Sequence, residues 1–300
     1  MSKPYSEVRF SERLFGALQH CLPTRLLSSC VHRLGQARTR WLKNILIRCF
    51  VHLYRIDMTT AAEPNPAAYP SFNAFFTRSL RSGLRPIDHR QHRIVAPVDG
   101  QLGTFGSTRS GRIFQTKGMA YDLADLLAAN RAWTQQFEGG MFATLYLAPA
   151  NYHRVHMPVD ATLRASHYVP GRLFGVNPAS VRSIPRLFTR NERVVALFDS
   201  SAGPMAMVMI GAFCVGGIET RWSGRVCPPH GRGAGRPLPT PSAANAPHFQ
   251  RGEEMGRFNL GSSVILLFGP QAMTWNEDLT SGQPLVLGRA IGRQRTAAGC

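Results

Sequence analysis

From residue 94 onward, the sequence is divided into short apolar runs that end at Gly, Pro or Asp. Runs of about four to eight apolar residues between turn-forming residues are typical of β-strands. Examples are residues 94–97, 141–147, 163–169, 194–198, 205–210 and 264–268. We therefore expect an α+β fold whose mainly β core consists of two packed antiparallel sheets.

The first 58 residues have a different character, with ten Lys and Arg but three Asp and Glu. Apolar residues recur at helical spacing in residues 42–53, with cations on the other side, and residues 14–27 repeat this pattern around Pro23. We expect basic amphipathic helices in residues 1–58 and a larger domain in residues 59–300. The helices can lie in a membrane interface or pack their apolar side on the protein, and their spacing favours neither.

The net charge of +18, from 35 Lys and Arg against 17 Asp and Glu, is typical of a protein with an anionic partner. Nucleic acid and an anionic membrane surface both fit this charge. The cations are dispersed and no recognised nucleic-acid motif is present, so we do not expect a nucleic-acid partner.

No segment is predicted to span a membrane. The longest uncharged run, residues 200–218, has an apolar part of 14 residues with three glycines, whereas a spanning helix needs about 20 apolar residues. A buried strand pair fits this run better. The N-terminus carries charges where an export signal needs an apolar core. The six cysteines include no Cys-x-x-Cys pair, which indicates reduced thiols.

Four other segments have local signals. Residues 59–90 are polar and marked by prolines, which predicts a connecting region with a short helix near residues 71–79. Leucines at helical spacing predict a helix at 121–130. The glycine-rich residues 103–111 lack the Lys and Ser or Thr of a phosphate-binding loop and are expected to be a turn. Residues 228–248 contain six prolines and are expected to form a flexible surface loop.

Three segments supply side chains that can do chemistry: residues 96–100 with Asp99, residues 152–158 with His153 and His156, and residues 254–263 with Ser262. Two histidines three apart can bind a metal on a helix, but nearby prolines argue against a helix and no third ligand is evident, so no metal is expected. Taken singly, the three segments are weak signals. Together Asp99, His156 and Ser262 supply the acid, base and hydroxyl of a charge-relay triad.

In their order along the chain, several motifs resemble those of phosphatidylserine decarboxylases of the bacterial membrane-associated type. The motifs are Pro-Val-Asp-Gly at 97–100, Lys-Gly at 117–118, Tyr-His-Arg-Val-His-Met-Pro at 152–158, Phe-Thr-Arg-Asn-Glu-Arg at 188–193, Gly-Ile-Glu-Thr at 217–220, and Gly-Arg-Phe-Asn-Leu-Gly-Ser-Ser at 256–263. The resemblance covers nearly the whole chain. The blocks at 152–158 and 260–262 are its most specific parts.

The resemblance implies a self-processing proenzyme. Ser262 would attack the carbonyl of Gly261, and the chain would separate into residues 1–261 and 262–300, which form a heterodimer. Ser262 would become the covalent pyruvoyl cofactor, form a Schiff base with phosphatidylserine and yield phosphatidylethanolamine. By the same resemblance, His156 is the base for self-cleavage, Asp99 orients His156, and His153 donates a proton during decarboxylation. Ser263 replaces the usual Thr, so scission between Ser262 and Ser263 is an alternative.

A lipid substrate also implies a membrane partner. The resemblance thus favours docking of the N-terminal helices on an anionic membrane, with the enzyme peripheral on the cytoplasmic side, and it allows a further oligomer. Two enzymatic alternatives stay open at this point. One is a metal-dependent hydrolase built on His153 and His156, and the other is pyruvoyl chemistry on a different amino-containing substrate.

Overall fold

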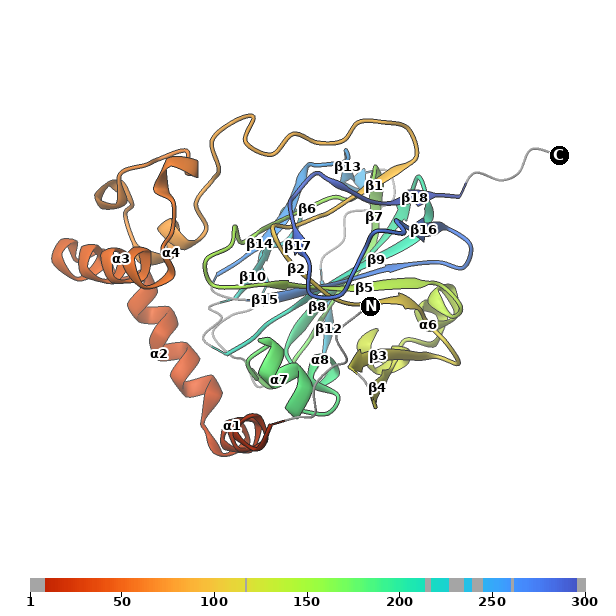
Figure 1. Ribbon diagram of the computed structural model, residues 1–300, viewed down its shortest axis with the longest axis horizontal. Coiled ribbons are helices and arrows are strands. Elements are labelled where there is room, and N and C mark those ends of the chain that lie inside the picture. The colour runs from red at the N-terminus through yellow and green to blue at the C-terminus, as the bar shows by residue number, and fades with distance from the viewer. Residues whose placement is uncertain are drawn as a thin grey trace.

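A large antiparallel sheet forms the centre of the protein (Figure 1). The computed structural model describes residues 9–116, 118–213, 217–226, 235–238, 245–259 and 262–295. Within these ranges the large sheet has nine strands, in the order β12-β7-β8-β9-β15-β5-β2-β17, with β13 also paired to β7. Its strands are β2 (Gly100–Ser107), β5 (Met141–Leu147), β7 (Ala161–Val169), β8 (Arg193–Ser200), β9 (Gly203–Ile210), β12 (Arg236–Pro237), β13 (His248–Phe249), β15 (Ser262–Phe268) and β17 (Pro284–Leu285). The expected mainly β core is confirmed.

Three smaller antiparallel sheets accompany the large one in the described chain, so the expectation of two sheets is wrong. The first consists of β1 (Arg93–Val95), β18 (Ala290–Gln294) and β16 (Met273–Trp275). The second consists of β11 (Gly224–Arg225), β10 (Ile218–Thr220), β14 (Glu254–Phe258) and β6 (Arg154–His156). The third consists of β3 (Arg112–Thr116) and β4 (Met119–Asp122). Most of these strands have two to five residues and too few apolar side chains to form a recognisable run.

Strand β15 shows why the central strands are continuously apolar. All seven of its residues are buried, and it pairs with β5 on one side and β9 on the other. Because side chains alternate along a strand, Val264 and Leu266 belong to one core cluster, while Ile265 and Leu267 belong to a second cluster on the opposite face. Both faces of the sheet are therefore covered, and alternation with polar residues is lost.

The helices lie around this core (Figure 1). Their bounds are α1 (Phe10–Cys21), α2 (Thr24–Gln36), α3 (Arg40–Tyr54), α4 (Phe72–Phe76), α5 (Leu123–Leu126), α6 (Arg131–Phe137), α7 (Pro178–Ser183) and α8 (Leu187–Arg190), with 3-10 turns at Met58–Thr60 and Pro66–Ala68. The predicted N-terminal helices and the short helix near 71–79 are present. Pro23 separates α1 from α2, since proline cannot donate an intrahelical hydrogen bond.

The N-terminal helices are attached to the rest of the protein by several contacts, among them Arg25 with Gly171 and His32 with Arg225. Gln19 of α1 donates a hydrogen bond to Ser180 of α7. At the other end, Ile47 of α3 is fully buried in an aromatic cluster formed with Ile56, Tyr69, Phe72, Phe75 and Phe76. The division of the chain at residue 58 stays a prediction.

Several local expectations need correction. The segment 121–130 is the end of β4 followed by the one-turn helix α5, because Ala128 and Ala129 adopt positive φ values of 61° and 57° that end the helix. Residues 103–107 of the expected turn belong to β2. In 200–218, β9 and the start of β10 form, but they belong to different sheets and do not pair.

The expected loop at 228–248 is partly outside the described residues, which omit 227–234 and 239–244. Its described parts are not a free loop, since β12 and β13 both pair with β7 and Leu238 is buried. Cys21, Cys30 and Cys49 are free thiols, whereas Cys214, Cys227 and Cys300 lie outside the described ranges. Among the helices described, none has the length and apolar character needed to cross a bilayer.

Candidate active site

Ser262 is the first residue of β15 and is fully buried. It lies opposite Leu147 of β5, and its side chain shares a face with Val264 and Leu266. Its hydroxyl has no hydrogen-bond partner within the described residues. Such a group is costly in a protein interior, which makes it a candidate for chemistry rather than for stability. Gly261, the other half of the predicted cleavage site, lies outside the described residues.

Asp99 lies at the same end of the sheet, just before β2. The next residue, Gly100, approaches β5 so closely that a Cβ there would be 2.4 Å from the carbonyl oxygen of Tyr146, so the position requires glycine. Ser262 and Gly100 flank Leu147 from opposite sides. At the usual strand spacing they are about 10 Å apart. Any proton transfer between Ser262 and Asp99 therefore needs a group between them.

The carboxylate of Asp99 is held by a fork of hydrogen bonds. Arg85 donates from Nε at 2.9 Å to each oxygen and from Nη2 at 2.6 Å, and the backbone amide of Leu287 donates at 2.8 Å. The hydrogen bonds that Arg85 donates to Asp99 outweigh the effect of burial and raise the pKa of Arg85. Arg85, rather than His156, is thus the direct partner of Asp99.

His156 lies beside this segment, because its backbone amide donates to Pro97 at 2.9 Å. Its Nδ1 contacts the carbonyl oxygen of Gly252 at 2.8 Å, and its Nε2 contacts the hydroxyl of Tyr152 at 3.2 Å. A carbonyl can accept only, so Nδ1 carries the proton and Nε2 is the basic nitrogen. The tautomer expected from Asp99 is therefore set here by Gly252.

Burial lowers the pKa of His156, against the opposing effects of the Gly252 carbonyl and, more weakly, of Glu254 and Asp99. The ring is consequently neutral at pH 7 and able to take a proton at Nε2. The structure places Asp99 and Ser262 on either side of β5, and it places His156, which belongs to another sheet, beside Pro97. It does not join them by hydrogen bonds, and their assignment as a triad stays a prediction.

His153 is fully buried and stacks on Phe76 with ring centroids 4.1 Å apart. In the described chain neither ring nitrogen has a hydrogen bond of normal geometry. The carbonyls of Ala148 and Pro149, which follow the Ser262 partner Leu147, nevertheless favour its charged form. Burial dominates and lowers the pKa of His153 to about 3, with a further contribution from the charge of Arg78. His153 is thus an uncharged ring at pH 7.

A polar network links α4 to the segment that precedes Ser262. Asn73 donates to Asn259 at 3.0 Å, and Asn259 donates to Glu219 at 2.9 Å. Burial alone would raise the pKa of Glu219, but hydrogen bonds from Asn259 and Arg257 outweigh it and lower the pKa. This network fixes the chain two residues before Gly261.

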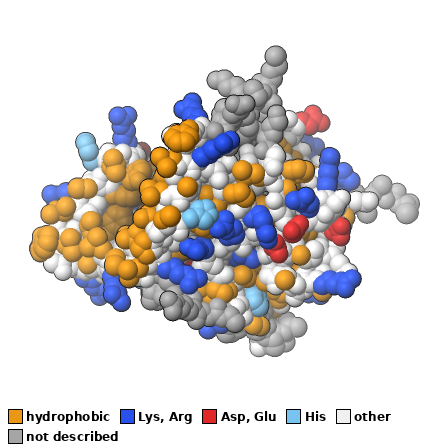
Figure 2. Space-filling model, turned by 90° about the horizontal axis from the view of Figure 1, so that it is seen from below, with side chains coloured by type: hydrophobic (Ala, Val, Ile, Leu, Met, Phe, Trp, Pro, Cys, Tyr) orange, Lys and Arg blue, Asp and Glu red, His pale blue; other side chains and the backbone are white. Residues whose placement is uncertain are grey.

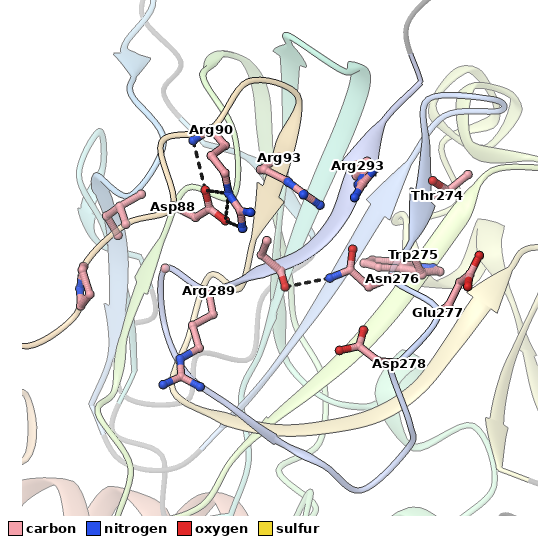
Figure 3. Close-up of a pocket in the computed structure, with 14 residues that line it drawn as sticks. Asp88, Arg90, Arg93, Thr274, Trp275, Asn276, Glu277, Asp278, Arg289 and Arg293 are labelled. Carbon is pink, nitrogen blue, oxygen red and sulfur yellow. Dashed lines mark hydrogen bonds and ion pairs between the residues drawn. The ribbon is translucent and has the colours of Figure 1, made fainter.

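An arginine-lined pocket of about 920 Å³ lies elsewhere, over the sheet formed by β1, β18 and β16 (Figure 3). Arg90, Arg93, Arg289 and Arg293 line it together with Asp88, Glu277 and Asp278. It contains none of the four predicted catalytic residues. It is also across the molecule from α1–α4 (Figure 1), so it is not the active site suggested by the sequence.

Four neighbours of the predicted site were not expected from the sequence: Arg85, Tyr152, Gly252 and Arg78. Tyr152 had a signal, since it begins the specific block at 152–158. Arg85, Gly252 and Arg78 are distant in sequence from the residues that they affect, and only the fold brings them there: Arg85 to Asp99, Gly252 to His156 and Arg78 to His153. Among the described residues, no group of three His, Cys, Asp or Glu side chains forms a metal-binding cluster.

Comparison with known proteins gives consistent matches. A family model described as phosphatidylserine decarboxylase matches residues 72–293, and a second model, PSD, matches residues 14–55. The chain is 47% identical over 291 residues to a phosphatidylserine decarboxylase proenzyme from Stutzerimonas stutzeri, with 96% of each chain covered. It is 46% identical over 285 residues to the proenzyme of that name from Pseudomonas fluorescens strain Pf-5, covering 94% of this chain and 97% of the relative. Against the proenzyme from Pseudomonas aeruginosa, identity is 45% over 292 residues, with 96% and 99% covered.

Proposed function

Because the chain belongs to the phosphatidylserine decarboxylase family, we propose that it decarboxylates phosphatidylserine to phosphatidylethanolamine with a pyruvoyl group made from its own Ser262. The observation that carries the proposal is the hydroxyl of Ser262, which is buried and unpaired among the described residues at the start of β15, on the opposite face of the sheet from the equally unpaired hydroxyl of Ser263. An unpaired hydroxyl at this point suits a residue that is to be converted into another group. A pyruvoyl ketone supplies an acceptor for the electron pair that departing CO₂ leaves behind.

Self-cleavage needs a base and an oriented hydroxyl. Nε2 of His156 takes the proton from Ser262 Oγ, which bonds to the Gly261 carbonyl carbon as the Gly261–Ser262 C–N bond breaks, and the proton passes to the freed amine of residue 262. Elimination of the Gly261 carboxylate from the resulting ester separates the two chains and leaves dehydroalanine at position 262. Hydrolysis of dehydroalanine releases ammonia and gives the pyruvoyl ketone. For the first of these steps, Nε2 has to exchange the Tyr152 hydroxyl for that of Ser262, while Gly252 continues to hold the proton on Nδ1. Asp99 acts from beside His156 by favouring its charged form.

The position of the two serines supports cleavage before Ser262. Ser262 shares a face with Val264 and Leu266, whereas Ser263 shares the opposite face with Ile265 and Leu267. The hydroxyl of Ser263 therefore points away from the side that carries Ser262. We infer that scission between Ser262 and Ser263 does not occur.

The two products are held together by the sheets. Strand β15 of the short chain, residues 262–300, is paired on both sides by strands of the long chain. In addition, β17 pairs with β2 and β18 pairs with β1. Such interleaved pairing supports a heterodimer that persists after cleavage, because separation would expose the buried face of every one of these strands.

Helices α1–α3 carry the surface that we assign to membrane docking. Hydrophobic side chains gather at the end of the molecule formed by α2 and α3, with Lys and Arg at the margins (Figure 2). The most exposed apolar residues of these helices are Phe10, Leu14, Leu18, Leu26, Trp41, Ile45 and Leu53. Exposed cations on the same helices include Arg13, Arg33, Arg40 and Arg48. An amphipathic surface of this composition fits an anionic bilayer, which is where a lipid substrate resides.

The proposal is tested with two matched variants. Ser262→Ala removes the nucleophile and is expected to leave one uncut 33.1 kDa chain that releases no CO₂ from phosphatidylserine. Ser263→Ala, which changes the neighbouring hydroxyl, is expected to cleave and to decarboxylate. A short chain produced by Ser262→Ala would disprove the assignment of Ser262.

A further inference from the structure

Arg78, which follows α4, is a buried cation with unsatisfied donors. Arg78 is 4% exposed, yet its Nε and Nη1 have no hydrogen-bond partner in the described chain. Nη2 makes a long hydrogen bond of 3.4 Å to the carbonyl of Ala150. Burial lowers the pKa of Arg78, but a guanidinium keeps its proton at any physiological pH. A fixed positive charge is therefore enclosed without an anion among the described residues.

A second buried arginine shows that unsatisfied guanidinium donors are not a general feature of this fold. Arg193 is 3% exposed, and its guanidinium donates to the carbonyls of Asp125, Leu126, Thr189 and Asn191. All three of its nitrogens are used. Because an unpaired buried charge is among the most costly features in a protein, the free donors of Arg78 point to a ligand that supplies an anion.

The surroundings of Arg78 connect it to the active site. Its guanidinium lies 5.2 Å from the ring centroid of Phe75, and the next residue, Phe76, stacks on His153. The charge of Arg78 contributes to lowering the pKa of His153. Phe75 and Phe76 also belong to the aromatic cluster that holds Ile47 of α3. Arg78 thus lies between the docking helices and the His153–Ser262 region.

This order matches the order of groups in the substrate. From the bilayer outward, a phosphatidylserine molecule presents acyl chains, glycerol, a phosphate, and then the serine amine and carboxylate. If the acyl chains stay with α1–α3 and the amine reaches residue 262, the phosphate falls between them. We propose, resting on the proposed function, that Arg78 binds the phosphate of the lipid headgroup through its free Nε and Nη1 donors. The planar guanidinium fork suits two phosphate oxygens.

The chemistry favours the phosphate over the carboxylate. The carboxylate loses its charge as CO₂ forms, so a guanidinium bound to it would stabilise the ground state more than the transition state and slow the reaction. The phosphate keeps its charge throughout. Arg78 is therefore a binding residue that acts equally on substrate, transition state and product, and its loss raises KM while kcat is little changed.

The test compares Arg78→Gln and Arg78→Lys with Arg81→Gln, which removes an exposed charge three residues away. Self-cleavage is measured first and is expected in all three. On phosphatidylserine in mixed detergent micelles, Arg78→Gln should raise KM by about tenfold to a hundredfold, as expected for charge-assisted hydrogen bonds. Arg78→Lys should lie in between, and Arg81→Gln should match the wild type.

Inhibition by glycerophosphoethanolamine identifies the bound group, since this headgroup has the phosphate but no carboxylate. Its inhibition constant should rise by the same factor as KM in Arg78→Gln, and inorganic phosphate should compete far less well. An unchanged inhibition constant would overturn the proposal, as would equal competition by inorganic phosphate. Failure of both Arg78 variants to cleave would also overturn it by assigning Arg78 to maturation. A wild-type protein that neither cleaves nor decarboxylates would instead contradict the proposed function.

Discussion

The buried ring of His153 makes the stability of the protein depend on pH in a predictable direction. Burial lowers its pKa from 6.5 to about 3. The unfolded chain therefore binds this proton more readily than the folded protein between these two values. The stability that comes from keeping the ring neutral is fully present above pH 6.5 and is lost progressively as the pH falls towards 3.

The size of the effect follows from the same values. A pKa shift of one unit corresponds to about 1.4 kcal/mol. Protonation of His153 in the unfolded chain should therefore make the free energy of unfolding about 2 kcal/mol lower at pH 5 than at pH 7. The ring has no exposed surface, so solvent does not reduce this figure. His153→Phe keeps an aromatic ring beside Phe76 but cannot titrate, and this contribution should disappear.

The measurement is urea unfolding at pH 7 and pH 5, in a Ser262→Ala background that keeps the protein as one chain. The difference in unfolding free energy between the two pH values should be about 2 kcal/mol smaller in His153→Phe. His89→Phe, at an exposed position, serves as the matched control and should leave the difference unchanged. Equal pH dependence with and without His153 would refute the assignment of a buried, neutral ring.

A neutral His153 also constrains its proposed role as a proton donor. At pH 7 the ring has no extra proton to give, and the charge of Arg78 helps to keep it so. An anion bound to Arg78 would cancel that charge and raise the pKa of His153. Because burial is the larger cause of the low pKa, cancelling the Arg78 charge would not by itself put a second proton on His153 at pH 7.

Three further predictions concern neighbours of the site and the docking surface. Asp99→Asn leaves Arg85 without its carboxylate and should slow self-cleavage and lower the unfolding free energy by about 1–3 kcal/mol, measured by gel time course and urea unfolding. Tyr152→Phe removes the competing hydroxyl at Nε2 of His156, so self-cleavage should not slow; a tenfold slowing would contradict our assignment of that contact. Replacing Trp41 and Leu53 together by Ser should reduce flotation with anionic vesicles, whereas Ser at the similarly exposed Phe114 should not; equal flotation of both variants would exclude the docking surface.

The strands that the sequence predicted best are those with both faces buried. Residues 141–147 coincide with β5, and 205–210 and 264–268 lie within β9 and β15, because a continuous apolar run is a direct consequence of two covered faces. The helix predicted at 121–130 forms only as the one-turn α5, for a different reason. Its leucines are buried by contacts with distant strands, and helical spacing cannot reveal the positive φ of Ala128.

The active site was predictable to the extent that motifs name residue types. Asp99, His153, His156 and Ser262 stand in specific blocks, and their assignment as catalytic residues stays a prediction. Their partners depend on contacts that no local pattern encodes, such as Leu287 on Asp99 or Gly252 on His156. Arg78 is one of 35 Lys and Arg in the chain and stands in a proline-marked segment. Its burial together with unpaired donors in the described chain distinguishes it, and no local pattern encodes that combination.

The central claim is that the peptide bond between Gly261 and Ser262 is broken and that residue 262 becomes a ketone. Intact mass spectrometry of active, purified protein, before and after treatment with hydroxylamine, tests it most directly. We predict two masses, for residues 1–261 and for a 39-residue chain 262–300 whose mass shifts on treatment as a carbonyl terminus requires. A single unmodified mass of 33.1 kDa in fully active protein would contradict the claim.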